Sequence, residues 1–443
     1  MKIYLPPQVE KAVETLTRSG FEAFLVGGCV RDTLMGKVPF DWDIATSALP
    51  NEIKQSFFDC KCIDTGIKHG TITVHVDHMP IEITTYRVDG AYTDSRHPDH
   101  VHFTARIEED LARRDFTMNA LAYNPSCGLI DCYEGRKDIA LRRICCVGNP
   151  DVRFQEDGLR ILRALRFSSV LDFEIEPATS ESIHRNRGQL QCISPERINA
   201  EFTKLLCGAK AAEVIHMYPL EMQQFLPEIN PLLSLKTDSG QSVWEHTRKT
   251  VTAVEAVPLL RLAMLLHEIE EPFSERTDSF TPDRKGAQLA EQALKKLRYD
   301  GSTVRAISEL VRLHNLPLVP EEKQILRYLN RLGVDLFHLL LKMREADVKA
   351  QVPVNQTAWN RLNKTKDMLS DILKTGRCYS IKDLQINGKD ILQCGIPEGA
   401  AVGKMLSFLL DAVIEGKCSN EKAELTQYML HHKGETRNGN GNN

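Results

Sequence analysis

The stretch 24–46 reads FLVGGCVRDTLMGKVPFDWDIAT and decides how the first part of the chain folds. It opens with apolar residues typical of a buried strand, breaks at the pair Gly27-Gly28, and continues as a short helix over 30–35. A second strand is expected to carry Asp41 and Asp43. Because these acids are two residues apart, their side chains would point to the same face of that strand.

This pattern predicts a site for phosphates and metal ions. Two carboxylates held side by side repel each other unless a cation lies between them. A glycine pair before a helix leaves backbone N–H groups free to meet an anion. Glu82, in the apolar run I-E-I, alternates correctly to add a third acid from a neighbouring strand, although a surface acid is the structural alternative. We therefore predict Mg²⁺-dependent chemistry on a nucleoside triphosphate.

The composition argues against a membrane-spanning protein, a secreted protein and a zinc protein with paired cysteines. The chain has 443 residues, enough for more than one domain, with 26% charged and 42% hydrophobic residues. It has neither an apolar run of membrane-spanning length nor a secretory signal, so we expect a cytoplasmic location. The 12 cysteines lack zinc-like spacing and are expected to be reduced. At a net charge of −4, nucleic-acid contacts would depend on local basic clusters.

The pattern of apolar residues changes along the chain. The first part mixes helices with strand-like runs at 71–76 and 81–86, residues 87–103 read as a loop, and residues 108–122 read as a helix. After residue 150 nearly everything is helical. We expect an α+β protein with five parts, namely a catalytic head (1–145), a helical neck with a nucleotide-selecting helix (146–210), a helical body (211–370), a helical tail (371–432) and a disordered end (433–443).

Within 108–122, the adjacent Arg113 and Arg114 suit phosphate oxygens, which guanidinium groups bind as forks. The structural alternative is an exposed basic helix start with Asp115 as its cap. Asn119 would lie inside an apolar helix, where a buried amide needs partners. A ribose hydroxyl would provide one.

The residues of a later expected helix, which begins near Glu156, indicate which nucleotide bases the protein would select. Asp157 and Arg160 are three residues apart and would meet on one helix face, with Arg163 and Arg166 along the same ridge. The structural alternative is a surface salt bridge worth a few tenths of a kcal/mol. Cytosine and adenine both present an amine donor beside a ring-nitrogen acceptor, so a carboxylate and a guanidinium would accept them and reject uracil and guanine. The other arginines could hold phosphate.

Five segments together resemble the bacterial class II tRNA nucleotidyltransferases, which comprise the CCA-adding enzymes and the similar poly(A) polymerases. They are GGCVRD, DWDIAT, RRDFTMNALAY, EDGLRILRALRF and SPERINAEFTKLL. The resemblance implies a polymerase beta-type head. It also implies that an RNA 3′-hydroxyl attacks the α-phosphate of CTP or ATP, and that body and tail hold the acceptor arm of tRNA. It assigns metal binding to Asp41 and Asp43, nucleotide binding to Gly28, Arg31, Arg114, Asp157, Arg160, Arg163 and Arg166, and the reading of the base to Asp157 and Arg160. To these we add Glu82 as a third catalytic acid beside Asp41 and Asp43, Asp115 and Asn119 as nucleotide-binding residues, and Glu156 in base selection.

The loop 87–103 bears on the choice within this family. Enzymes that add only the two cytidines lack such a loop, so its presence favours addition of the terminal A. Full CCA addition is the first expectation, A addition alone the second, and poly(A) synthesis the third because basic extensions are missing. A catalytically dead RNA-binding protein is disfavoured by the intact acid pair. The flexible-loop residues are Asp89, Tyr92, Asp94, Arg96 and His97.

A second resemblance concerns the body. Residues 243–247 and 261–268 resemble an HD phosphohydrolase domain, in which a His–Asp pair binds metal. Here Glu268 stands at the Asp position, Glu271 replaces a lysine, and a ligand histidine expected near 283–286 is absent. We expect a helical scaffold that has lost its metal site. The alternative, an active phosphohydrolase, predicts phosphatase activity with Ni²⁺ or Mn²⁺.

Overall fold

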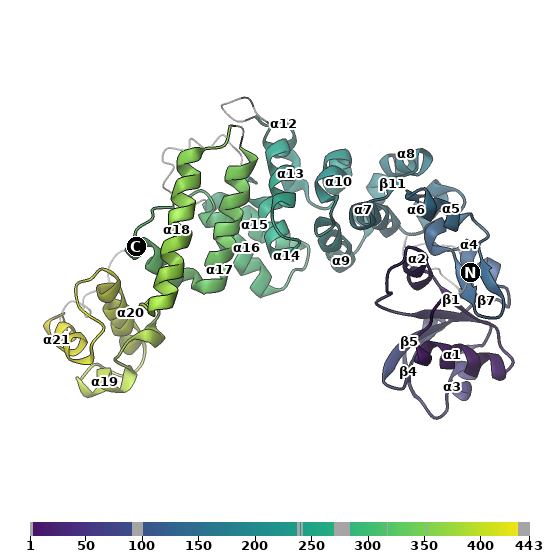
Figure 1. Cartoon of the computed structure of the whole chain (residues 1–443), viewed down its shortest axis with the longest axis horizontal. Coiled ribbons are helices and arrows are strands. Elements are labelled where there is room, and N and C mark those ends of the chain that lie inside the picture. The colour runs from purple at the N-terminus through teal and green to yellow at the C-terminus, as the bar shows by residue number, and fades with distance from the viewer. Residues whose placement is uncertain are drawn as a thin grey trace. The chain divides into compact units, whose positions relative to one another are not determined.

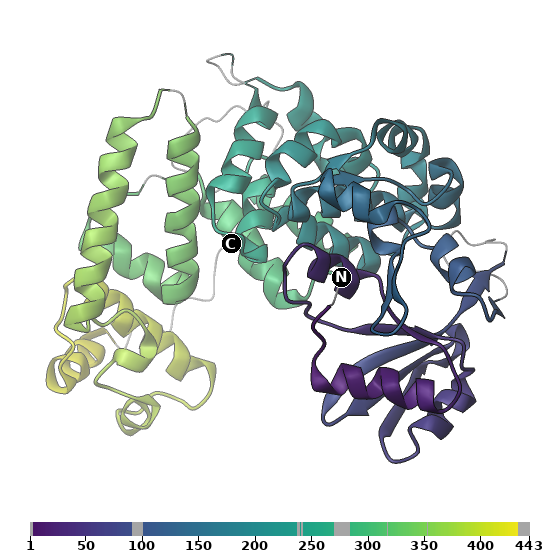
Figure 2. The same cartoon turned by 45° about the vertical axis from the view of Figure 1, so that its right-hand side comes forward.

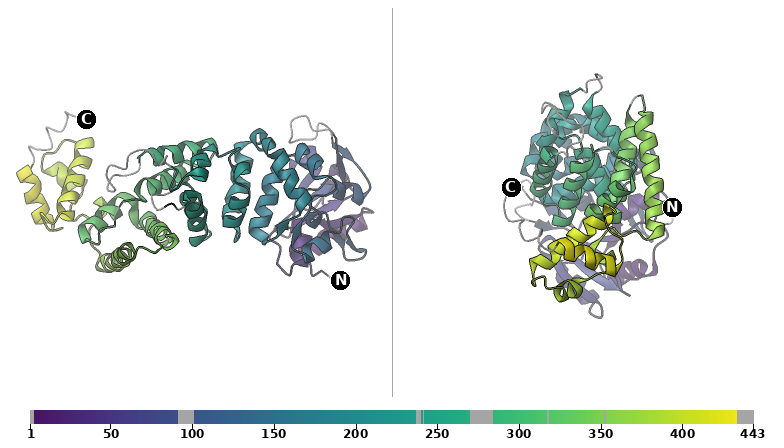
Figure 3. Two further views of the ribbon diagram at one scale, coloured as in Figure 1. Left: turned by 90° about the horizontal axis from the view of Figure 1, so that it is seen from above. Right: turned by 90° about the vertical axis from the view of Figure 1, so that its left-hand side faces the viewer.

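Figures 1, 2 and 3 show the computed structural model of the whole chain. It divides into two compact units, Met1–Leu233 with Ala293–Asp300, and Ser234–Gln292 with Gly301–Asn443. The predicted α+β class is confirmed, with a sheet in the first unit and helices elsewhere. The structure describes residues 3–90, 101–236, 240, 242–269, 284–316, 318–351 and 353–432.

The first unit contains a seven-stranded mixed sheet. Strand β2 (Asp43–Thr46) lies in its interior, antiparallel to β1 (Ala23–Val26) and parallel to β5 (Met79–Thr85). The order across the sheet is β3-β4-β5-β2-β1-β8-β9, in which the remaining strands are β3 (Lys61–Gly66), β4 (Thr71–Val76), β8 (Ala122–Asn124) and β9 (Gly128–Ile130).

The two faces of the sheet have different neighbours, and this fixes where the acids point. Helix α1 (Pro7–Arg18) and helix α3 (Pro50–Ser56) contribute to one core, which also contains Ile44 of β2. Figure 2 shows α1 in dark purple running along the sheet. The next residue, Ala45, belongs to a second core on the opposite face. Because strand side chains alternate, Asp43 lies on the face opposite α1 and α3.

Helix α2 (Gly28–Leu34) follows β1 directly, and the rest of the first unit is mainly helical. Helix α7 (Leu159–Leu171) packs against α9 (Pro195–Leu206) and has ten buried residues, so little of its surface meets water. The other helices are α4 (Ile107–Ala112), α5 (Gly135–Ala140), α6 (Pro150–Glu156), α8 (Pro177–Asn186), α10 (Ala211–Met217), α11 (Pro219–Met222) and α12 (Asn230–Ser234).

The second unit is helical throughout its described residues. Its longest helices, α17 (Glu322–Ala350) and α18 (Gln356–Thr375), lie side by side (Figure 1). Helices α19 (Gly388–Gln393), α20 (Ala400–Ile414) and α21 (Lys422–His432) pack together, in yellow-green and yellow in Figure 3. The others are α13 (Val243–Ala253), α14 (Pro258–Leu266), α15 (Arg284–Lys296) and α16 (Gly301–Leu313). Among the described residues no helix is long and apolar enough to cross a membrane.

Two sequence predictions about the first unit are wrong. Asp41 does not share a strand with Asp43, because it lies in a bend and β2 begins only at Asp43. Residues 108–122 are not one helix. Helix α4 ends at Ala112, and a 3₁₀ turn follows at Thr117–Asn119. Backbone bonds to the segment 145–147 draw the chain out of helical geometry, since Thr117 N–H donates to the carbonyl of Cys145 at 2.9 Å.

The loop prediction for 87–103 also needs correction at both of its ends. Strand β6 (Arg87–Asp89) pairs antiparallel with β7 (Val101–Phe103). Residues 91–100, with the predicted loop residues Tyr92, Asp94, Arg96 and His97, lie outside the described residues, as does the predicted disordered end 433–443. The remaining two-stranded sheet joins β10 (Arg143–Ile144) to β11 (Glu174–Ile175).

Candidate active site

The three predicted carboxylates lie close enough to influence one another at the start of β2. Asp43 and Glu82 are register partners in the parallel pair β2–β5, so their side chains leave the sheet on the same face. Burial raises the pKa of Asp43 to about 6, together with the charges of Asp41 and Glu82, while Arg114 opposes the rise. Carboxylates that repel each other in this way fit a divalent cation, whose charge would favour their ionised forms.

Arg114 is held beside these acids by a buried carboxylate. Its guanidinium lies 3.1 Å from Asp110, which also binds Arg113 at 2.7 Å. Burial alone would raise the pKa of Asp110, but the two arginines hold it below its usual value. On its other side Arg114 meets Gly27, where φ is +73° and a Cβ would lie 3.0 Å from a guanidinium nitrogen. The first glycine of the pair therefore lets Arg114 approach the backbone closely.

A chain of side-chain contacts connects α2 to α7. Arg31 donates to Asp32 at 2.8 Å and to the amide oxygen of Asn119, also at 2.8 Å. The amide nitrogen of Asn119 donates to Asp115 at 3.0 Å, and Asp115 receives Arg163 at 2.6 Å. Asn119 therefore finds its partners within the protein, and Arg31 is almost fully buried with them. The structure therefore shows both residues as parts of a buried network beside α2.

Asp115 is the buried centre of this chain. Burial would raise its pKa, but Arg163, Asn119 and Arg160 lower it to about 2. Farther along α7, Arg166 lies 2.5 Å from Glu201, and its guanidinium stacks 3.8 Å from the ring centroid of Phe167. The arginines of this ridge are thus anchored by acids and an aromatic ring.

The first prediction concerns the stability of this network. Asp115→Asn would leave the charge of Arg163 with only the more distant Glu201, at 3.7 Å, as a charged partner, so the free energy of unfolding should fall by about 3 kcal/mol. Because the folded pKa of Asp115 lies below its unfolded value, its contribution is fully present above about pH 4. It should be lost as the pH falls through about 2. Urea unfolding of the wild type and the variant between pH 7 and 2 measures this difference.

The matched control is Asp172→Asn, which removes an exposed pair with Arg142. This change should cost less than about 1 kcal/mol, because surface ion pairs contribute little. Equal losses in the two variants, or a difference independent of pH, would contradict the role of Asp115.

The predicted base-reading pair is arranged differently from the expectation. Asp157 has an extended backbone between α6 and α7, so the two residues are not neighbours on one helix. The carboxylate of Asp157 accepts two hydrogen bonds from the guanidinium of Arg197, at 2.7 and 3.2 Å. Arg160 donates to Glu156 at 2.5 Å and to the carbonyl of Arg113 at 3.0 Å. Each group is thus oriented by another residue. A carboxylate can accept about four hydrogen bonds, so Asp157 retains capacity for a base.

Three family models match the chain. They are described as the poly(A) polymerase head domain, matching residues 23–145, the "Probable RNA and SrmB-binding site of polymerase A", matching 172–233, and tRNA nucleotidyltransferase domain 2, matching 285–429. The CCA-adding enzyme of Lactobacillus gasseri is 34% identical over 435 residues, which are 97% of this chain and 99% of that enzyme. The chain belongs to the CCA-adding enzyme family. The CCA-adding enzyme of Enterococcus faecalis is 33% identical over 424 residues, with coverage of 94% and 93%.

Solved structures of CCA-adding enzymes have the same fold. The Bacillus stearothermophilus enzyme in complex with CTP superposes with a TM-score of 0.72 at 28% identity, covering 99% of this chain and 100% of that one. The Thermotoga maritima enzyme complexed with tRNA gives 0.58 at 18% identity, with coverage of 97% and 96%, and shows the fold alone. The resemblance to class II tRNA nucleotidyltransferases is therefore confirmed. CCA-adding enzymes are nucleotidyltransferases that generally need a divalent metal.

The sequence did not point us to three residues that orient the candidate site, namely Asp110, Arg197 and Glu201. Asp110 lies three and four residues before the arginines it binds, a spacing that favours contact on a helix. Arg197 and Glu201 lie four apart in SPERINAEFTKLL, which served above only for the resemblance. Asp89, predicted as a loop residue, lies in β6 at 3.6 Å from Arg113.

Proposed function

We propose that this chain adds CCA to the 3′ end of tRNA, with CTP and ATP as substrates and Mg²⁺ as the metal. The observation that carries the proposal is the meeting of Asp41, Asp43 and Glu82 beside Arg114, in a chain that aligns with CCA-adding enzymes over nearly its whole length. The 3′-oxygen of the RNA forms a bond to the α-phosphorus. The bond from this phosphorus to the β-phosphate oxygen breaks, and pyrophosphate leaves.

The residues have separate roles in this proposal. Asp41 and Asp43 hold Mg²⁺, with Glu82 as the third acid of the site. The metal, when bound, stabilises charge on the triphosphate and activates the attacking hydroxyl. Arg114 and the backbone of Gly28, together with Arg31 at the buried side of α2, bind triphosphate oxygens.

Nucleotide choice lies with the segment that joins α6 to α7. Asp157 accepts a hydrogen bond from the exocyclic amine of C or A, and Arg160 donates to the ring nitrogen. Their orientation depends on Arg197, which binds Asp157, and on Glu156, which binds Arg160. Arg163 and Arg166 supply positive charge along the same helix. Asp115 acts through Arg163 and does not need to touch the nucleotide.

Binding of tRNA calls for local positive charge, because the chain as a whole is acidic. One cavity in the second unit is lined by Arg284, Arg305, Arg312 and Arg331, together with apolar residues and two glutamates. Arg312 and Arg331 both pair with Glu309, which reduces the positive charge of the cavity, but guanidinium groups in this number suit RNA phosphates. We assign the second unit to tRNA binding on this basis, and we infer a cytoplasmic location, where tRNA is matured.

Separate incubations with single nucleotides test the proposal. With tRNA that ends before CCA, CTP alone should extend the RNA by two residues and ATP alone should add nothing. With tRNA ending in CC, ATP should add one residue. Incorporation of A only, on the CC-ending substrate alone, would identify an A-adding enzyme. Long A tails would identify a poly(A) polymerase. Either result would overturn CCA addition, and both are read from product lengths on a gel.

A further inference from the structure

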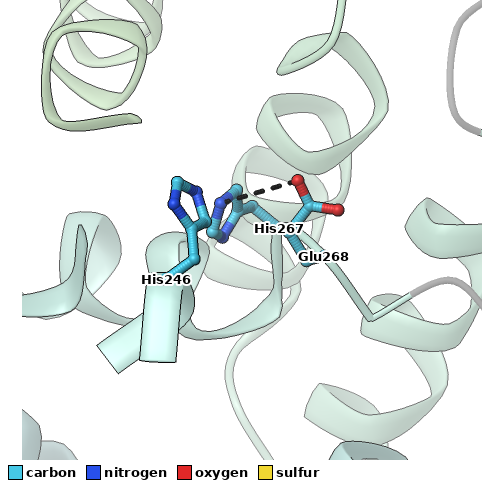
Figure 4. Close-up of side chains that lie close together, drawn as sticks. All are labelled: His246, His267 and Glu268. Atoms are coloured by element: carbon cyan, nitrogen blue, oxygen red, sulfur yellow. Dashed lines mark ion pairs between the residues drawn. The ribbon is translucent and has the colours of Figure 1, made fainter. Parts of the chain in front are cut away.

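Three imidazoles and two carboxylates meet inside the second unit, far along the chain from the acids of the head. His246 comes from α13, and His267 and Glu268 follow α14. Figure 4 shows the two rings beside each other and the carboxylate next to them. His314 follows α16, and Asp347 lies on α17. Four helical segments therefore contribute to one cluster.

The distances place the donor atoms of His246, His267 and Glu268 around one point, with Asp347 and His314 beside them. Nε2 of His246 lies 2.9 Å from Asp347 Oδ1, and Nε2 of His267 lies 4.0 Å from the same oxygen. Oε1 of Glu268 lies 4.0 Å from Nε2 of His267 and 4.0 Å from Nε2 of His314. Ligand atoms of His246, His267 and Glu268 all lie within 4.8 Å of one another. Around an ion at about 2.1 Å from each donor, separations of roughly 3 to 4 Å are expected.

Hydrogen bonds set the tautomer of two of the rings. Nδ1 of His267 lies 2.6 Å from the carbonyl of Met264, and Nδ1 of His314 lies 2.5 Å from the carbonyl of Val311. A carbonyl only accepts, so each Nδ1 carries the proton and each Nε2 presents a lone pair to the cluster. This arrangement, with one ring nitrogen bound to a carbonyl and the other free to coordinate, is typical of metal-ligating histidines.

These lone pairs have no hydrogen-bond partner among the described residues. Nε2 of His267 and Nε2 of His314 are both unsatisfied and buried, and the residues are 1% and 3% exposed. A buried polar atom without a partner costs about 1 to 3 kcal/mol.

We propose that His246, His267, Glu268, His314 and Asp347 form a binding site for one divalent transition-metal ion. Mixed imidazole and carboxylate donors favour Zn²⁺, Ni²⁺, Co²⁺ or Fe²⁺ over Mg²⁺, which prefers oxygen donors alone. A structural polar cluster is the competing explanation. It accounts for the pair of His246 with Asp347, but it leaves the lone pairs of His267 and His314 without hydrogen-bond partners in the part of the chain that the structure describes.

The proposed site differs from the expectation of a scaffold that has lost its metal site. That expectation counted Glu268 as a lost ligand and looked for a downstream histidine near 283–286. A glutamate is still a carboxylate ligand, one methylene longer than aspartate. The helical fold then brings in His314 and Asp347, whose distance along the chain from Glu268 hid their role.

Direct metal binding tests this proposal independently of nucleotidyl transfer. The full chain carrying Asp41→Ala and Asp43→Ala, which lacks the head site, is stripped with a chelator and titrated with Ni²⁺. Bound metal is then counted by elemental analysis after gel filtration. We expect one tightly bound ion per chain, retained in excess Mg²⁺. In the same background, His267→Gln and Glu268→Gln should each weaken binding by on the order of 10-fold to 100-fold or more.

The matched control is His184→Gln in the first unit, where His184 binds the buried Glu221 at 2.8 Å. It should leave the stoichiometry and affinity unchanged. Glu268 is 20% exposed at its side chain, so Glu268→Gln remains informative where His267→Gln does not fold. Failure of the chain to retain an ion, or equal affinity in the cluster variants and the control, would overturn the site.

Discussion

Replacing Asp41 by alanine is expected to reduce nucleotide incorporation by about 10³-fold or more, because the proposed metal site would lose one of the two residues that would hold the ion, and a bound ion would supply several kcal/mol of charge stabilisation. Asp41 is exposed and lies before β2, so the fold should not depend on it. The affinity for tRNA should change little. Single-turnover incorporation from labelled CTP and a filter-binding measurement with the same tRNA separate the two effects.

Asp77→Asn is the matched control for that variant. Asp77 is another exposed acid of the same sheet-containing part, and it pairs with Lys11 at 3.1 Å. Its replacement should leave incorporation within about twofold, since an exposed pair contributes little. Substantial incorporation by Asp41→Ala would remove the metal assignment, whereas a matching loss in Asp77→Asn would point to a general effect of charge.

The second large effect concerns the choice of nucleotide. Arg160→Ala should raise incorporation of U and G relative to C and A by on the order of 10-fold to 100-fold, because one well-formed set of base contacts is worth about 1 to 3 kcal/mol. Asp157→Ala should act in the same direction. The measurement is kcat/KM for each of the four nucleotides on one tRNA substrate, so that a uniform loss of activity cancels from the ratio.

Arg185→Ala is the control for this experiment. Arg185 is an exposed arginine of α8. Its ion-pair partner is Asp151, at 3.0 Å, whereas Arg160 pairs with Glu156. It should leave the four ratios as they are in the wild type. Unchanged selection in both Arg160→Ala and Asp157→Ala would assign the choice of base to other residues.

The parts of the fold that follow local patterns were predictable from the sequence. The apolar runs gave the strands β1, β4 and β5 and the amphipathic α1 within a few residues. The alternation in I-E-I correctly placed Glu82 beside Asp43, because the period of a strand is two and the register follows the buried isoleucines.

The errors arose where tertiary contacts override local preference. The segment after Ala112 has helical periodicity, but backbone pairing with residues 145–147 turns it into an extended stretch and a 3₁₀ turn. The expected contact of Asp157 with Arg160 failed for a related reason. Arg197 on α9 and Glu156 on α6 take these groups as partners, and no local spacing reveals which helices will pack together.

The cluster of histidines and carboxylates in the second unit also shows that local sequence patterns do not reveal which helices pack together. His246, His267 and Glu268 were visible as a familiar pattern, but His314 and Asp347 are separated from it by 46 or more residues of chain. Only the packing of α13, α14, α16 and α17 brings the five side chains together. A count of ligands along the sequence therefore could not include His314 and Asp347.

The most direct test of CCA addition supplies all four nucleoside triphosphates together. The chain is incubated with Mg²⁺ and a tRNA that ends before CCA, and the 3′ ends of the products are sequenced. The proposed function predicts that C, C and A are added in that order and that synthesis then stops. Ends that carry U or G, that stop without the terminal A, or that continue into a run of A would contradict it.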